Sequence, residues 1–236
     1  MTDSLEAFPE DWDRALAVVA HPDDMEYGAA SAVARWTSEG KHVAYLLVTR
    51  GEAGIASMAP EQVIELRAVE QRRSCEAVGV ESLEYLDHPD GLVVESLELR
   101  RDLAAAIRRH QPDVVLSINH RESWGGPSWN HADHRAVGRS LLDATRDAGN
   151  RWLFPEVGEP WSGVRYVAFN ASPESTHAVD VTDHIDAGIA SLACHELYLD
   201  ALDEPTDPDS FLRGGARAFG ERFGCEYATA FEIITP

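Results

Sequence analysis

Two short segments hold most of the side chains that could bind a metal ion. The first reads HPDD, from His21 to Asp24, and the second reads HADH, from His131 to His134. Imidazole nitrogens and carboxylate oxygens are good zinc ligands, and a hydrolytic zinc site needs about three of them with a fourth position open to water. It also needs a carboxylate or histidine that takes a proton from the attacking water. Together the two segments could supply the ligands and the base of a metal-dependent hydrolase.

Each segment alone has a plainer interpretation. Asp beside Pro is common in turns and Asp caps helices well, so HPDD could be a turn that starts a helix. His and Asp also suit an exposed helix start, which is the plainer interpretation of HADH. Both interpretations become weak if the two segments face each other, because six polar side chains would then meet at one place by accident.

The elements that must position these segments alternate between strands and helices. Short apolar runs predict buried strands over residues 14–20, 43–49, 83–86, 114–118 and 164–169. Periodic apolar residues predict helices over 25–38 and 60–79, around 99–107 and 137–144, through 185–199, and in a short segment ending at 219–223. This alternation predicts an α/β fold whose mostly parallel sheet is covered by helices on both faces. HPDD and HADH then both follow strands at the carboxyl edge, where such folds bind ligands.

Composition limits the kind of partner. The chain has 236 residues and a formal net charge of −21, which disfavours nucleic acid and anionic membranes as partners. This length suits one domain over residues 1–236. The sequence lacks both a long apolar run and a signal-peptide pattern, so we expect the protein in the cytoplasm. Whether copies assemble into a homo-oligomer is left open. The scattered cysteines indicate neither a disulfide framework nor a thiolate zinc site; they are Cys75, Cys194 and Cys225.

At the two polar segments the chain resembles the LmbE-like, or PIG-L, family of zinc-dependent N-deacetylases, which act on compounds such as N-acetylglucosaminyl sugars. The stronger matches are AHPDDMEYG at 20–28, TRGEAG at 49–54 and HADH at 131–134. Weaker ones lie at 66–80, 88–91 and 180–195. The resemblance implies a Rossmann-like sheet, one catalytic Zn²⁺, and a small-molecule substrate that loses an N-acyl group, most often acetyl.

The resemblance also implies a role for each residue of the two segments. By position, His21, Asp24 and His134 are similar to the zinc ligands of the family. Asp23 is similar to the general base that accepts a proton from water. The neighbouring carboxylates would therefore have different tasks, which an irregular turn allows because adjacent side chains point in different directions.

Four further residues carry implied roles. His131, in its protonated form, is similar to the group that stabilises the oxyanion, and either His131 or Asp23 would protonate the leaving amine. Asp133 is similar to a carboxylate that orients a histidine. Arg67 and Asp90 are similar to substrate-contacting residues of sugar deacetylases. The alternatives for these last two are a surface ion pair and a turn Asp.

The loop before HADH departs from the family pattern. It reads RESWGGPSWN and carries Trp124 and Trp129, where relatives have a glycine-rich loop. We expect both rings to line the substrate pocket, and the alternative is that they anchor the loop to the core. Because this loop faces the substrate, two other functions stay open: a zinc-dependent hydratase or lyase using the same site, and a non-catalytic small-molecule binder.

Overall fold

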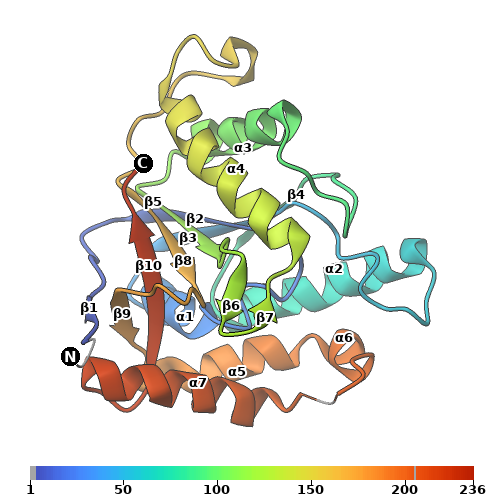
Figure 1. Ribbon diagram of the computed structural model, residues 1–236, viewed down its shortest axis with the longest axis vertical. Helices are drawn as coiled ribbons and strands as arrows, with labels where there is room; N and C mark the ends of the chain where they lie inside the picture. The colour runs from blue at the N-terminus through green and yellow to red at the C-terminus, as the bar shows by residue number, and fades with distance from the viewer. Residues whose placement is uncertain (1–3, 205) are drawn as a thin grey trace.

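The computed structural model describes residues 4–204 and 206–236. Within these residues one large sheet has the strand order β1-β9-β10-β8-β5-β2-β3-β4, and a small hairpin is formed by β6 and β7 (Figure 1). The strands are β1 (Glu6–Ala7), β2 (Arg14–Val19), β3 (His42–Leu47), β4 (Ser82–Tyr85), β5 (Val114–Ile118), β6 (Ser123–Gly125), β7 (Ser128–Trp129), β8 (Tyr166–Asn170), β9 (His177–Asp180) and β10 (Ala228–Ile234). The helices are α1 (Ala30–Ser38), α2 (Pro60–Ala77), α3 (Leu97–His110), α4 (Ala132–Gly149), α5 (Ile185–Ala193), α6 (Glu196–Asp200) and α7 (Pro208–Phe223).

The central part of the sheet is parallel. Strands β8, β5, β2, β3 and β4 all run in the same direction. Strand β10 runs antiparallel to its neighbours β8 and β9. The predicted α/β fold with a mostly parallel sheet is therefore confirmed. Because β2 and β5 pair directly and in parallel, their carboxyl ends lie at the same edge of the sheet, which matters for function.

Helices cover both faces of the sheet. Along β2, Ala15, Ala17 and Val19 pack into one apolar core, while Leu16 and Val18 pack into the other. This two-residue alternation is what a strand buried on both faces requires. Helices α1, α5 and α7 lie over the first core, and α3 and α4 lie side by side over the second (Figure 1). No helix among the described residues is long and apolar enough to cross a membrane.

The helix predicted over 25–38 begins only at Ala30, because the segment after β2 forms successive turns. Asp23 takes a φ of 84°, a left-handed conformation that a non-glycine residue rarely adopts. Its carbonyl accepts a hydrogen bond from the amide of Tyr27 at 3.0 Å. The HPDD segment is thus held in an irregular turn at the edge of the sheet.

The long helix predicted through 185–199 is wrong, since the chain forms α5 and α6 with a break at His195. The amide of Leu197 donates to the carboxylate of Glu70 on α2 at 2.6 Å. This contact satisfies a first-turn amide of α6 from outside the helix, so the chain can change direction here. The short helical segment predicted to end at 219–223 is a full helix, α7.

Candidate metal centre and active site

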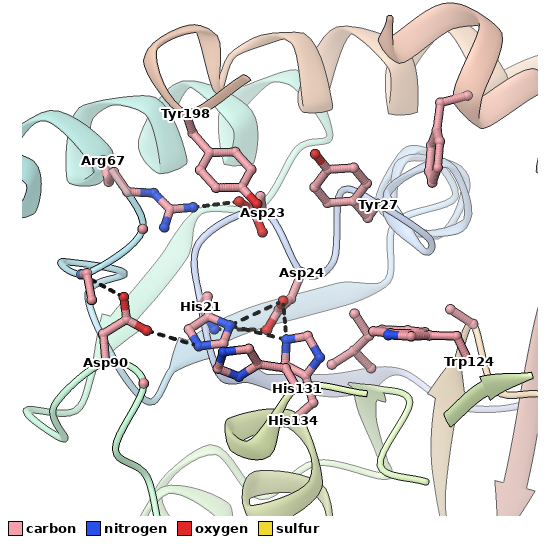
Figure 2. Close-up of a pocket in the computed structure, with 16 residues that line it drawn as sticks. His21, Asp23, Asp24, Tyr27, Arg67, Asp90, Trp124, His131, His134 and Tyr198 are labelled. Carbon is pink, nitrogen blue, oxygen red and sulfur yellow. Dashed lines mark hydrogen bonds and ion pairs between the residues drawn. The ribbon is translucent and has the colours of Figure 1, made fainter. Parts of the chain in front are cut away.

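The two polar segments meet at the carboxyl ends of β2 and β5. HPDD follows β2 directly, and HADH forms the start of α4 after the β6–β7 hairpin, with His131 as its N-cap. Figure 2 shows the side chains of His21 and Asp24 from one segment and of His131 and His134 from the other lying close together. The ring nitrogens Nδ1 of His21 and Nε2 of His134 lie 3.2 Å apart, although 113 residues separate them in the chain.

Three donor atoms form a triangle that fits a metal ion. The Oδ1 atom of Asp24 lies 3.0 Å from Nε2 of His134 and 3.6 Å from Nδ1 of His21. A tetrahedral zinc at about 2.0–2.2 Å from each ligand would separate its ligand atoms by roughly 3.3–3.6 Å. The spacing and the chemistry of these donors therefore suit a divalent cation.

Hydrogen bonds fix which nitrogen of each ring faces the triangle. The Nε2 atom of His21 lies 3.2 Å from Asp133 and 3.1 Å from Asp90, so it is the nitrogen that donates. The Nδ1 atom of His134 lies 3.0 Å from the side-chain oxygen of Asn130. With a metal ion bound, each ring would carry its proton on the outer nitrogen and present the other nitrogen to the ion, and the contact of His21 with Asp133 matches a carboxylate–histidine–zinc triad.

The charges around the two ligands agree with a cation site. Burial by itself lowers the pKa of His21, but Asp24, Asp133 and Asp90 raise it well above the usual value. Burial raises the pKa of Asp24, yet His134 and His21 hold it far below the usual range. The carboxylates therefore favour positive charge at this point, whether from protons or from a metal ion.

His131 lies beside the triangle. A ring nitrogen of His131 is within 4.8 Å of ligand atoms of His21 and His134, so it is a geometric alternative to Asp24. However, its Nδ1 atom accepts the amide hydrogen of Asp133 at 3.1 Å, which leaves the proton on Nε2. Burial and the neighbouring His21 and His134 also lower the pKa of His131. The hydrogen bond to Nδ1 leaves an Nε2–H group as the donor of His131, and its role in stabilising the oxyanion stays a prediction.

Asp23 lines the same cavity as the triangle and contacts Arg67. The Nη2 atom of Arg67 lies 2.5 Å from Oδ2 of Asp23, and the Asp23 amide donates to Gln71 at 3.1 Å. Burial raises the pKa of Asp23, and the Arg67 guanidinium opposes that shift. The left-handed backbone of Asp23 is strained, and such strain persists only when neighbouring groups fix the residue in place. Arg67 and Gln71 of α2 supply these contacts.

Arg67 is a buried residue, so the alternative of a surface ion pair is wrong. Its side chain is 2% exposed and also donates to the carbonyl oxygens of Pro22 at 2.7 Å and Gly51 at 3.2 Å. The ring of Tyr198 lies 4.4 Å from the guanidinium carbon. A Cβ at Gly51 would lie 2.2 Å from Nη1 of Arg67, which explains the glycine in the TRGEAG segment.

The two remaining carboxylates join the loop after β4 to the site. Asp133 is fully buried and accepts hydrogen bonds from the amides of Gly91 at 2.7 Å and Val93 at 3.1 Å. Asp90 accepts from the amide of Ala53 at 2.8 Å while its other oxygen faces His21. Asp90 therefore has the contacts of a turn residue as well as a position in the cavity.

A cavity of about 430 Å³ opens over these side chains. Its lining includes every residue predicted to bind metal or to touch substrate except Trp129, together with the predicted base and the predicted oxyanion donor. These residues are His21, Asp23, Asp24, Arg67, Asp90, Trp124, His131 and His134. The Trp124 ring stands edge-on to His134, with ring centroids 5.6 Å apart. Trp129, on the exposed hairpin strand β7, is 66% exposed and lies under the guanidinium of Arg135. The structure thus places Trp129 outside the cavity, contrary to the prediction.

Sequence reasoning missed several residues at the site. Tyr27 lies within the matched AHPDDMEYG segment, and Gln71 follows Arg67 by one helical turn, so both could have been found. Tyr198 and Phe211 come from α6 and α7 and complete the cavity. They lie outside any motif, and only the folded chain brings them to the site.

Comparison with known proteins identifies the family. The chain belongs to the PIG-L family, because the family model described as GlcNAc-PI de-N-acetylase matches residues 16–145. It is 27% identical over 228 residues to diacetylchitobiose deacetylase of Thermococcus kodakarensis, covering 94% of this chain and 83% of that protein. It is 29% identical over 192 residues to 1D-myo-inositol 2-acetamido-2-deoxy-alpha-D-glucopyranoside deacetylase of Thermomonospora curvata, covering 70% of this chain and 62% of that protein.

Solved structures confirm the fold. The N,N'-diacetylchitobiose deacetylase of Pyrococcus horikoshii superposes with a TM-score of 0.84 at 23% identity, over 95% of this chain and 85% of that one. The 4-carboxy-2-hydroxymuconate hydratase of Pseudomonas putida superposes with a TM-score of 0.74 at 21% identity, over 95% and 97%. The fold alone therefore allows both reactions, whereas the family model and the sequence relatives favour the deacetylase over the hydratase.

Proposed function

We propose that this protein is a zinc-dependent hydrolase that removes the N-acyl group, in the simplest case acetyl, from an amino sugar or a metabolite containing one. The observation that carries the proposal is the triangle of His21, Asp24 and His134 with the carboxylate of Asp23 beside it. The sequence relatives support an amino-sugar substrate, since both are named as deacetylases of acetamido sugars. A binder without catalysis would need the ligands but not the neighbouring base.

The side chains around the triangle have separate tasks in this reaction. A zinc ion bound there supplies Lewis acidity and lowers the pKa of water. Asp23 accepts a proton from the attacking water, and Arg67 holds its carboxylate in place. The Nε2–H group of His131 donates to the carbonyl oxygen as negative charge develops on it. Asp23 or His131 then delivers a proton to the amine nitrogen as the C–N bond breaks.

The polar side of the cavity suits the sugar. Arg67 and Asp90 offer charged groups for hydroxyls on one side of the triangle, and Trp124 offers an aromatic face on the other (Figure 2). We also propose that residues 1–236, of which 1–3 and 205 lie outside the described part, form one domain that works in the cytoplasm. The apolar cores on the two faces share a single sheet, which supports the one-domain proposal.

The proposal is tested by product analysis on zinc-loaded protein. N-acetylglucosamine and diacetylchitobiose are the first substrates, and free amine and acetate are measured together. We expect the two products in equal amounts. If neither appears while an unsaturated carboxylic acid gains water without releasing an acyl group, the hydratase alternative is correct instead.

A further inference from the structure

A second cavity, of about 350 Å³, adjoins the first on the side away from Arg67. Four lining residues are common to both cavities: Tyr27, Trp124, Ala171 and Phe211. The rings of Tyr27 and Phe211 meet edge to face with centroids 5.4 Å apart. We call this second cavity the apolar annexe. Because the cavities share walls, a molecule bound at the triangle can extend into it.

The annexe is built for hydrocarbon. Leu212, Ala216 and Phe219 line it from α7, Ile185 from α5, and Ala228 from β10. Among the described residues that line it there is no Asp, Glu, Lys, Arg or His. The polar side chains among its lining residues are Tyr27, Ser31, Trp124 and Thr229, which carry hydroxyl or indole N–H groups. A hydrocarbon chain buried here would not strip water from any charged side chain of the lining.

The direction of the annexe indicates which part of the substrate enters it. Figure 2 shows Arg67 and Asp90 on one side of the histidines, and Trp124 on the other. The carbonyl carbon of an amide carries the sugar nitrogen on one side and the acyl group on the other. With the sugar on the polar side, the acyl group points past Trp124 toward the annexe.

We infer that the N-acyl group removed by this enzyme is longer than acetyl and that its unbranched hydrocarbon chain lies in the annexe. The inference rests on the proposed function and narrows its substrate class. Water adds its oxygen to the carbonyl carbon, the C–N bond breaks, and the nitrogen gains a proton. The products are a free amino sugar and a medium-chain carboxylic acid.

The first test is a chain-length series on zinc-loaded protein. The substrates are N-acetyl-, N-butanoyl-, N-hexanoyl- and N-octanoylglucosamine, with free amine as readout. Burying one methylene is worth about 0.8 kcal/mol, so kcat/KM should rise by up to about fourfold for each added methylene that the annexe takes in. A flat series, or one that falls from acetyl onward, overturns the inference.

Two neighbouring glycines of α7 provide matched variants. A Cβ at Gly215 or at Gly214 meets no heavy atom within 4 Å, so both positions accept a larger side chain. Gly215 lines the annexe, whereas Gly214 lies outside its lining. Gly215→Leu should bring the octanoyl-to-acetyl ratio of kcat/KM down toward one, and Gly214→Leu should keep the wild-type ratio. Equal ratios in the two variants overturn the assignment of the chain to the annexe.

Binding of the acid products separates this inference from the proposed function. Octanoate and acetate are titrated into wild-type protein and both variants by calorimetry, which needs no turnover. We expect octanoate to bind at least tenfold more tightly than acetate, and Gly215→Leu alone to remove the difference. If that pattern holds but no amine is released from any substrate, the proposed function fails and the annexe stands. If octanoate and acetate bind with equal affinity, the acyl chain does not lie in the annexe, whether or not the enzyme is active.

Discussion

The adjacent carboxylates of HPDD have different surroundings. Asp24 faces the nitrogens of His21 and His134, whereas Asp23 faces the guanidinium of Arg67. The left-handed backbone of Asp23 turns the two side chains apart. The sequence indicated two carboxylates with separate tasks. The φ of Asp23 and the burial of Arg67 could not be read from it, because both depend on how α2 packs against the HPDD turn and the TRGEAG segment.

Loss of one histidine should remove the metal. His134→Ala leaves two ligand residues, which hold zinc poorly, so metal content measured after dialysis should fall from close to one ion per chain to well under half. His110→Ala is the control, because this histidine pairs with Glu84 far from the site. Full metal occupancy in His134→Ala would contradict the ligand assignment.

The two tryptophans of the hairpin should differ in their effect on binding. Trp124→Ala removes a ring from the cavity wall, so KM should rise several-fold while metal content stays the same. Trp129→Ala removes a largely exposed ring, so both KM and the melting temperature should stay near wild type. Michaelis constants and melting curves of the two variants check this. A larger rise of KM in Trp129→Ala would show that the hairpin closes over the substrate.

At the scale of elements, the loop from β5 to α4 is fastened to the sheet by an ion pair. Arg121 donates through Nε to Glu232 of β10 at 2.9 Å, and Ser172 donates to the same carboxylate at 2.6 Å. Burial raises the pKa of Glu232, but these two partners outweigh it and hold the pKa below its usual value. The contact fixes one end of the loop that carries Trp124.

This ion pair predicts a pH-dependent contribution to stability. A carboxyl group whose pKa is lower in the folded state stabilises the fold above its unfolded pKa of about 4.3, and the contribution is lost as pH falls through the folded pKa. Glu232→Gln should therefore lower the free energy of unfolding at pH 7, and its difference from wild type should shrink below about pH 4. Denaturant titrations from pH 7 to pH 3.5 measure this difference. A difference that stays constant over that range would show that the charge of Glu232 adds nothing.

The strands of the parallel part of the sheet, β2, β3, β4, β5 and β8, could be predicted from the sequence better than the last part of the chain. Apolar runs such as 43–49 and 114–118 are buried on both faces, and their composition alone marks them. Strands β9 and β10 were not predicted. Strand β10 pairs antiparallel with β8 and β9 beyond the parallel part of the sheet, and part of its burial comes from α7. The same helix closes the annexe, so the apolar side of the pocket was also hidden from the sequence.

At the scale of the whole molecule, the sheet brings together residues from every part of the chain. The parallel pairing of β2 with β5 joins HPDD to HADH, and α2, α6 and α7 close the cavity from one side. We propose that this assembly is a metal-dependent N-deacylase in which Asp24 binds the ion and Asp23 acts as base.

One measurement tests that claim most directly: metal content and amine release from an N-acylglucosamine, determined on the same preparations of wild type, Asp23→Asn and Asp24→Asn. Wild type should lose activity on treatment with a chelator and regain it with zinc. Asp23→Asn should keep its metal and lose roughly a hundredfold or more in turnover, as expected for loss of a general base. Asp24→Asn should lose metal first and activity as a consequence. Exchanged phenotypes, or a wild type that stays fully active without metal, would contradict the account.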